Sequence, residues 1–232
     1  MFYVLSEAVS ASVQFSQILA LLLGYILAIV IAFGLHEYSH ARTAFKLGDP
    51  TAKALGRMTI NPLRHLDYFG VISFLIIGFG WAKPVPINPL NFKNQRKGIF
   101  LVSISGVLMN ICLAFVFCGI FYFYMKNVAT YTAEDVLYFS NSLLYFVYYF
   151  LLFSISINIA LFIFNLLPIF PLDGFNAMIS AFRLSPRFIN FMYRYGNIIL
   201  IFIIILPIFD VVYGAVTNSI AGVFFKFWGL FA

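Results

Sequence analysis

Charged residues are scarce in this sequence. Only 9% of its 232 residues are Asp, Glu, Lys or Arg, whereas 63% are hydrophobic. Soluble globular domains have about 25% charged residues, so this composition excludes that class. We therefore predict an all-α polytopic membrane protein, a single membrane-embedded domain over residues 1–232, with length for about five to six transmembrane segments including one short re-entrant segment.

Cysteine and histidine are also rare. Cys112 and Cys118 lie in one apolar run and are too far apart on a helix to form a disulfide. We interpret both as buried packing residues without a redox role. The chain has three histidines, which excludes a di-iron membrane oxygenase, because that class needs many more imidazole ligands.

Basic residues outnumber acidic ones, 14 to 8, and give a formal net charge of +6. They gather in short clusters between the apolar runs, within residues 42–64, 83–97 and 183–194. A nucleic-acid-binding protein would instead concentrate them on one face, so no nucleic acid is expected as a partner. By the positive-inside rule these loops are cytoplasmic, which predicts a multi-pass protein of the cell membrane.

The sequence HEYSH stands at the end of the first long apolar run, at residues 36–40. On a helix, His36 and His40 lie one turn apart on the same face, so both imidazoles can reach one Zn²⁺ while Glu37 faces a water on that metal. This spacing is typical of zinc hydrolases. The alternative is a pair of structural histidines beside an interfacial Glu, but ionisable groups at membrane depth are costly and usually functional.

The apolar runs and their breakers predict the helices. The first run, residues 15–35, is expected to continue as helix through His40 until Gly-Asp-Pro at 48–50 ends it. Further helices are expected over 98–125 and 136–167, followed by an outward segment over 195–207 and a return over 211–225. The zinc motif would then lie at the inner end of a membrane helix.

Residues 68–81 are apolar but short, rich in glycine, and followed by further basic residues. A segment with basic flanks on both sides is expected to dip into the membrane and return, which requires protein or water around its backbone. The prolines at 84, 86 and 89 then preclude a helix and predict extended chain with unpaired edges. The alternative for residues 84–89 is a plain interfacial loop.

A third metal ligand has to come from elsewhere in the chain. The sequence NLLPIFPLDG at 165–174 breaks the helix with two prolines, and Gly174 permits a turn directly after Asp173. Following the topology, Asp173 reaches the same side of the membrane as His36 and His40. We therefore favour Asp173 over His65 as the third ligand; its alternative role is to cap the amphipathic stretch 175–182.

Gly106 and Asn110 share one face of the helix predicted over 98–125. A glycine lets a neighbouring helix approach, and an amide inside the membrane needs a hydrogen-bond partner. Asn110 is therefore expected either to join two helices or to support the site.

Together these motifs resemble the site-2 protease family, the M50-type intramembrane zinc metalloproteases, in its compact prokaryotic form without appended domains. The resemblance runs from about residue 35 to residue 175, and its motifs are HEYSHA at 36–41, LGDPTA at 47–52, GR at 56–57, NP at 61–62, GWAKPVPINP at 80–89, Gly106 with Asn110, and NLLPIFPLDG at 165–174. There is one departure: the helix with Asn110 reads SGVLMN, where the family usually has Ala-Gly-Pro before the Asn. Without that proline, the local kink that the family would imply is not expected with the same force, whereas the metal motifs are intact.

The resemblance implies a zinc metalloendopeptidase that hydrolyses peptide bonds in or near the transmembrane segments of membrane proteins, in regulated intramembrane proteolysis. The residues it implies are His36, His40 and Asp173 as ligands of one Zn²⁺ per chain, Glu37 as catalytic base, Asn165 in substrate binding, and Asn110 beside the site. Its implied partners are transmembrane protein substrates in a lipid bilayer, with the active site toward the cytoplasmic side.

Other function classes fit part of the sequence. A divalent-metal transporter or channel could use the same ligands, but it does not need Glu37, and the sequence has no ladder of further His or acidic residues across the membrane. A catalytically silent scaffold would not need the full set of catalytic groups. A protease, in contrast, must unwind a helical substrate before water reaches its carbonyls, and residues 84–89 are a candidate edge for the unwound strand.

Overall fold

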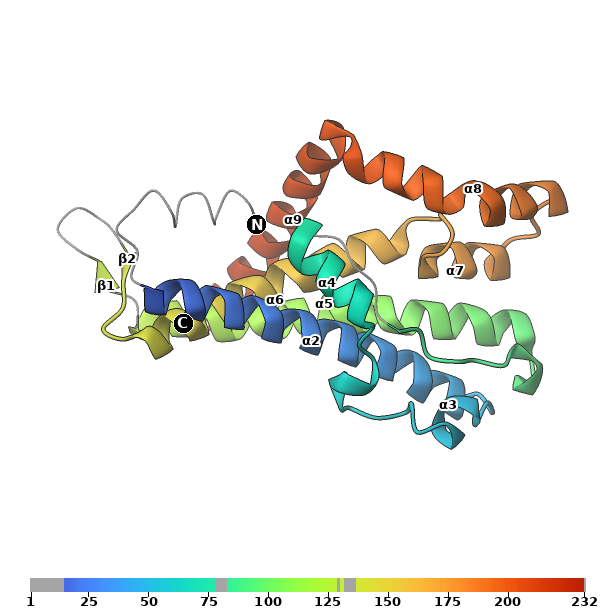
Figure 1. Ribbon diagram of the computed structural model, residues 1–232, viewed down its shortest axis with the longest axis horizontal. Coiled ribbons are helices and arrows are strands. Elements are labelled where there is room, and N and C mark those ends of the chain that lie inside the picture. Colours follow the sequence, from blue (N-terminus) through green and yellow to red (C-terminus); the bar gives the residue numbers. More distant parts are fainter. Residues whose placement is uncertain (1–14, 78–82, 129, 132–136, 232) are drawn as a thin grey trace.

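The computed structural model describes residues 15–77, 83–128, 130–131 and 137–231. Its helices are α2 (Phe15–Lys46), α3 (Thr51–Ala54), α4 (Tyr68–Ile77), α5 (Gln95–Val128), α6 (Ser142–Leu166), α7 (Asp173–Ala181), α8 (Pro186–Ile205) and α9 (Pro207–Gly229), with 3₁₀ turns η1 (Pro62–Arg64) and η2 (Pro89–Asn91) (Figure 1). Two short strands, β1 (Thr130–Tyr131) and β2 (Leu137–Tyr138), pair antiparallel. The predicted all-α class is confirmed.

Within the described residues, four helices are long and apolar enough to cross a membrane, namely α2, α5, α6 and α8. Helix α4 has 10 residues, about 15 Å at 1.5 Å per residue, which is roughly half of the ~30 Å hydrocarbon core. Its dip into the membrane stays a prediction, and residues 78–82 of that segment lie outside the described residues. Helix α9 contains the predicted return segment, residues 211–225. The chain is thus a multi-pass membrane protein.

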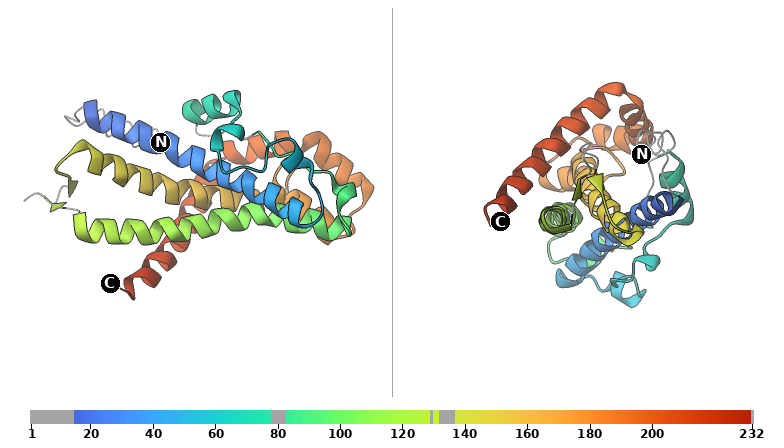
Figure 2. Two further views of the ribbon diagram at one scale, coloured as in Figure 1. Left: turned by 90° about the horizontal axis from the view of Figure 1, so that it is seen from below. Right: turned by 90° about the vertical axis from the view of Figure 1, so that its left-hand side faces the viewer.

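Helices α2, α5 and α6 pack against one another and form the centre of the molecule, with α9 crossing α5 and α6 obliquely (Figure 2). One buried cluster joins α2 to α6 through Tyr25, Ala28, Ile29, Ala32, Phe33 and Ile157. At Gly24 a Cβ would lie 2.8 Å from the backbone nitrogen of Phe150. Glycine therefore allows the backbones of α2 and α6 to approach closely, as small residues do between membrane helices.

The two cysteines have different environments. Cys118 is buried against α6 and α9, as predicted, but Cys112 is exposed. Residues six positions apart lie about 120° from each other around a helix axis, so both cannot face the same neighbours. The prediction of burial is therefore wrong for Cys112.

The chain between α6 and α7 turns back toward the centre of the bundle. Helix α6 ends at Leu166, and α7, which packs on α5, begins at Asp173. A Cβ on Gly174 would lie 2.5 Å from the carbonyl oxygens of Leu166 and Leu167. The described glycines with positive φ are Gly48 and Gly56, so Gly174 serves this close contact and not the turn that the sequence suggested.

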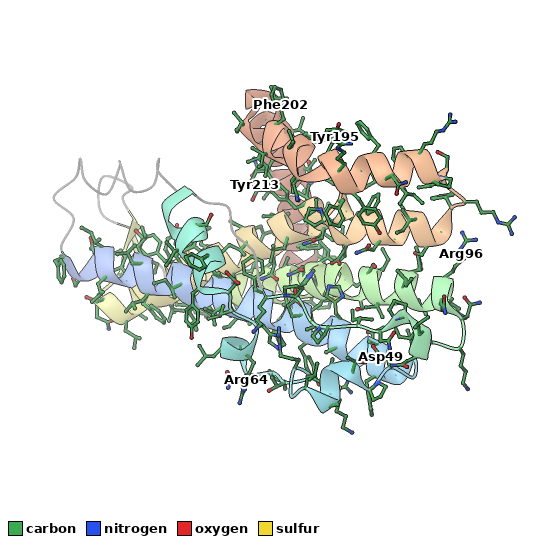
Figure 3. All side chains as sticks on the ribbon, turned by 45° about the vertical axis from the view of Figure 1, so that its right-hand side comes forward. Asp49, Arg64, Arg96, Tyr195, Phe202 and Tyr213 are labelled. Carbon is green, nitrogen blue, oxygen red and sulfur yellow. The ribbon has the colours of Figure 1, made fainter. Side chains whose placement is uncertain are left out.

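The basic loops lie at one end of the bundle. They follow α2, precede α5, and join α7 to α8, and all three reach the right-hand end of Figure 1, although the loop after α2 then runs back toward the middle of the molecule, where Figure 3 labels Arg64. Asp49 and Arg96, labelled in Figure 3, lie at this end. The arrangement agrees with basic loops that share one side of the membrane; which side that is stays a prediction.

Candidate active site

The HEYSH sequence lies within α2, which runs unbroken to Lys46. His36 and His40 are buried, with exposed fractions of 5% and 6%. Their Nε2 atoms are 3.0 Å apart. The one-turn spacing therefore directs both imidazoles to the same point, as the sequence predicts.

Asp173 meets the two histidines from the first turn of α7. Its Oδ2 atom lies 3.1 Å from Nε2 of His36 and 3.1 Å from Nε2 of His40. The N-cap of α7 is Leu172, without a side-chain cap bond, so the alternative capping role of Asp173 is not seen. His65 is buried elsewhere, where its Nε2 lies 2.9 Å from the carbonyl oxygen of Thr59.

The hydrogen bonds of the two Nδ1 atoms determine whether the Nε2 atoms of His36 and His40 can act as metal ligands. Nδ1 of His36 lies 2.5 Å from Oδ1 of Asn110, and Nδ1 of His40 lies 2.8 Å from the carbonyl oxygen of Val102. Both partners are acceptors, so in a neutral imidazole each Nδ1 carries the proton and each Nε2 presents a lone pair. Two nitrogen lone pairs and a carboxylate oxygen thus converge.

Such a convergence of acceptors can hold a metal cation. Burial raises the pKa of Asp173, but the neighbouring His40 and His36 lower it by more. The net pKa is well below the ordinary value of a carboxyl group, so Asp173 is charged. The ligand-atom separations are 3.0–3.1 Å, close to the roughly 3.3 Å expected for tetrahedral Zn²⁺ with bonds of about 2.0–2.1 Å. Among the described residues, His36, His40 and Asp173 form the group that can hold a metal ion, and their donor set fits zinc.

A buried chain of amides supports His36 from the neighbouring helices. Asn110 Nδ2 donates to Asn158 Oδ1 at 2.9 Å, and Asn158 Nδ2 donates to the carbonyl oxygen of Ser154 at 2.8 Å. Both asparagines are fully buried. Asn110 therefore reaches the site through His36, as a supporting residue that also joins α5 to α6.

Asn158 was not among the site residues predicted from the sequence. Its signal was present, because an amide inside a predicted membrane helix needs a partner. The sequence also did not predict the reason for Gly106, where a Cβ would lie 2.5 Å from the ring of His40 and 2.6 Å from that of His36. Glycine is required there because the imidazoles lie against the backbone of α5.

Glu37 is also buried, with an exposed fraction of 8%. Its Oε2 atom accepts a hydrogen bond of 2.9 Å from the backbone N–H of Val85. Val85 belongs to residues 83–88, which form neither helix nor paired strand, as predicted for the proline-rich stretch. A backbone amide thus fixes one oxygen of the candidate base.

Asn165 lies in the last turn of α6 and is half-buried. Its Nδ2 donates to the carbonyl oxygen of Leu161, in its own helix, at 3.0 Å. This bond does not connect Asn165 to His36, His40 or Asp173. A role of Asn165 in substrate binding therefore stays a prediction.

The part of the chain that contains the candidate site is similar to known proteins. Residues 24–205, which include every candidate site residue, match Peptidase family M50. A Bacillus subtilis (strain 168) protein named "Putative zinc metalloprotease YwhC" is 44% identical over 152 residues, and this match covers 65% of each chain. The chain thus spans about two thirds of the length of that relative. No solved structure gives a significant match.

Replacing Asn158 by leucine tests the amide chain. Asn158→Leu removes the acceptor that orients the Asn110 amide toward His36, so we expect a zinc affinity about 10-fold weaker, the lower end of the range for losing a residue bonded directly to a metal ligand. The measurement is competition for zinc against a chelator of known affinity, with protein purified in detergent.

Asn165→Leu is the matched control, since it makes the same change on the same helix, at an amide bonded only within that helix. Its zinc affinity should equal that of wild type. Equal affinities for all three proteins would contradict a supporting role for Asn158.

Proposed function

The chain belongs to peptidase family M50, and from this premise we propose that it is a membrane zinc metalloprotease, an endopeptidase that cleaves other membrane proteins in or near their transmembrane segments. The observation that carries the proposal is the buried convergence of two imidazole nitrogens and one carboxylate oxygen beside Glu37. The family match favours this function over metal transit through the same ligands.

His36, His40 and Asp173 would hold one Zn²⁺. When bound, the ion supplies Lewis acidity, which lowers the pKa of a water from about 15.7 toward 7 and polarises the scissile carbonyl. Three protein ligands are typical of catalytic zinc sites, which keep one position open for water or substrate. Nδ1 of His36 donates to Asn110 and Nδ1 of His40 to Val102, which in the neutral imidazoles leaves both Nε2 lone pairs for this role.

Glu37 acts as the general base and then as the general acid. It takes a proton from the attacking water and gives it to the leaving amine of the cleaved bond. The hydrogen bond from Val85 engages Oε2, so proton transfer falls to Oε1. Because Glu37 is 8% exposed, bulk water does not compete strongly at the carboxylate.

The position of the site sets the class of substrate. His36 and His40 lie within a helix long and apolar enough to cross the membrane, so a segment that reaches them comes from the bilayer or its edge. A helix keeps its carbonyls in internal hydrogen bonds and must unwind before cleavage. We therefore expect single-span substrates with helix-breaking residues, cut toward the cytoplasmic side, where basic loops are retained.

Residues 84–89 offer an edge for the unwound strand of a substrate, but this edge has fewer unpaired backbone amides than the sequence suggested. Three of these residues are prolines, and the amides of Val85 and Asn88 already donate to Glu37 and to Asp49. Ile87 carries the remaining amide. Strand addition is therefore proposed to use Ile87.

Glu37→Gln tests the proposed function. The amide retains the size of the side chain but cannot accept the proton, so we expect zinc content equal to wild type and kcat lower by about 10²- to 10⁴-fold. Zinc per chain is counted in detergent, and both proteins are incubated with a panel of single-span substrates.

Two results would contradict the proposal. One is cleavage by Glu37→Gln at the wild-type rate. The other is failure of both proteins to cleave any substrate while wild type carries zinc across liposome membranes, which would identify a transporter.

Ile87→Pro tests strand addition. It removes one backbone donor, worth about 0.5–1.5 kcal/mol, so cleavage should slow roughly 2- to 10-fold while zinc stays bound. Ile87→Val, which keeps the amide, serves as control and should cleave at nearly the wild-type rate. Equal turnover by the proline and valine variants would rule out a substrate contact at this amide.

A further inference from the structure

The segment 83–88 lies beside Glu37 and is held at both ends. Between its ends, the buried Val85 donates its amide to Glu37. The Val85 side chain packs with Ala41 of α2 and Ala52 of α3. The position of this segment therefore determines where one oxygen of Glu37 is fixed.

Asp49 holds the far end of the segment. This fully buried carboxylate, just after α2, accepts a hydrogen bond of 2.7 Å from the backbone N–H of Asn88 at Oδ2. At Oδ1 it accepts bonds from Nδ2 of Asn91 at 2.7 Å, and from the backbone N–H and hydroxyl of Thr51. Burial raises the pKa of Asp49, but these donors lower it below the ordinary value, so the carboxylate is charged at neutral pH.

Arg57 holds the near end. Its Nη2 donates to the carbonyl oxygen of Lys83 at 2.7 Å and lies 3.4 Å from that of Pro84. The backbone N–H of Lys83 donates to the carbonyl oxygen of His65 at 2.9 Å. The backbone N–H and the backbone carbonyl group of Lys83 are thus both hydrogen-bonded to residues that follow α3.

The composition of the segment transmits this restraint. Between the anchored ends, Pro84 and Pro86 fix φ near −65° at two positions, and Pro89 does the same just after Asn88. Few torsions are therefore free between the two anchored ends, and the Val85 amide has little freedom to turn away from Glu37. Loss of either anchor should release it.

We propose that Asp49 and Arg57 are positioning residues of the protease, which hold the segment 83–88 at its two ends so that the Val85 amide fixes Glu37 for proton transfer. This inference rests on the proposed function for its catalytic consequence, but the mechanical link from Asp49 to Val85 does not. It explains why the motifs at 47–52, 56–57 and 80–89, which contain no metal ligand, accompany the metal-binding residues in one chain.

Hydrogen exchange measures the link directly. Between residues 84 and 90 only Val85, Ile87, Asn88 and Leu90 carry an amide hydrogen, so peptides that span this stretch resolve few sites. We expect Glu37→Ala to release the Val85 amide alone. Asp49→Ala should release Asn88 and also Val85, each with exchange at least 10-fold faster than in wild type.

Thr51→Val is the matched control, because it removes the hydroxyl bond to Asp49 but leaves the bond between Asp49 and Asn88. Its exchange at Val85 should equal that of wild type. Arg57→Ala gives an independent test from the other end and should also release Val85, whereas Arg57→Lys, which keeps a donor, should restore part of the protection. Zinc content and thermal midpoint in detergent identify the folded variants.

Kinetics give the catalytic readout. In Asp49→Ala and Arg57→Ala we expect kcat to fall roughly 10- to 100-fold, as for a displaced catalytic group, with zinc content unchanged. Continued protection of Val85 in both zinc-loaded variants would overturn the proposal. Because exchange needs no substrate, this outcome differs from failure of the proposed protease function, in which wild type would cleave nothing while the exchange pattern held.

Discussion

The structure depends on one electrostatic constraint, the meeting of three electron-rich atoms in a buried place. Nε2 of His36, Nε2 of His40 and Oδ2 of Asp173 lie 3.0–3.1 Å apart. Two lone pairs face a buried carboxylate there, and because an unpaired buried charge costs several kcal/mol, a metal cation between the three atoms would stabilise the group. The surrounding helices hold these three side chains together in an arrangement that could bind a metal ion.

Each neighbouring element contributes to that arrangement through a different kind of contact. Helix α5 holds both imidazoles by their outer nitrogens and gives them room at Gly106. Helix α6 steadies α5 through Asn158, and the turn after α6 returns Asp173 to the histidines. The loop beside α2 fixes Glu37 through a backbone amide. The proposed metal ligands and the proposed base are therefore positioned by separate parts of the chain, which can be perturbed one at a time.

Much of this was predictable from the sequence, and the rest has physical reasons for being missed. The helices followed from apolar length and proline breaks, and the meeting of Asp173 with His36 followed from counting membrane crossings. Asn158 was missed because α5 and α6 are apolar on nearly every face, so the pattern does not tell which face turns inward. The bond from Val85 was missed because a backbone amide has no side-chain signature. The exposure of Cys112 was missed for the same reason as Asn158.

Zinc K-edge X-ray absorption on the purified protein tests the central claim most directly. The account predicts two imidazole nitrogens and oxygen ligands at about 2.0–2.1 Å, a spectrum unchanged in His65→Asn, and zinc weakened or lost in Asp173→Asn. A third imidazole in the wild-type spectrum that disappears in His65→Asn, or a full zinc complement with the wild-type spectrum in Asp173→Asn, would contradict it.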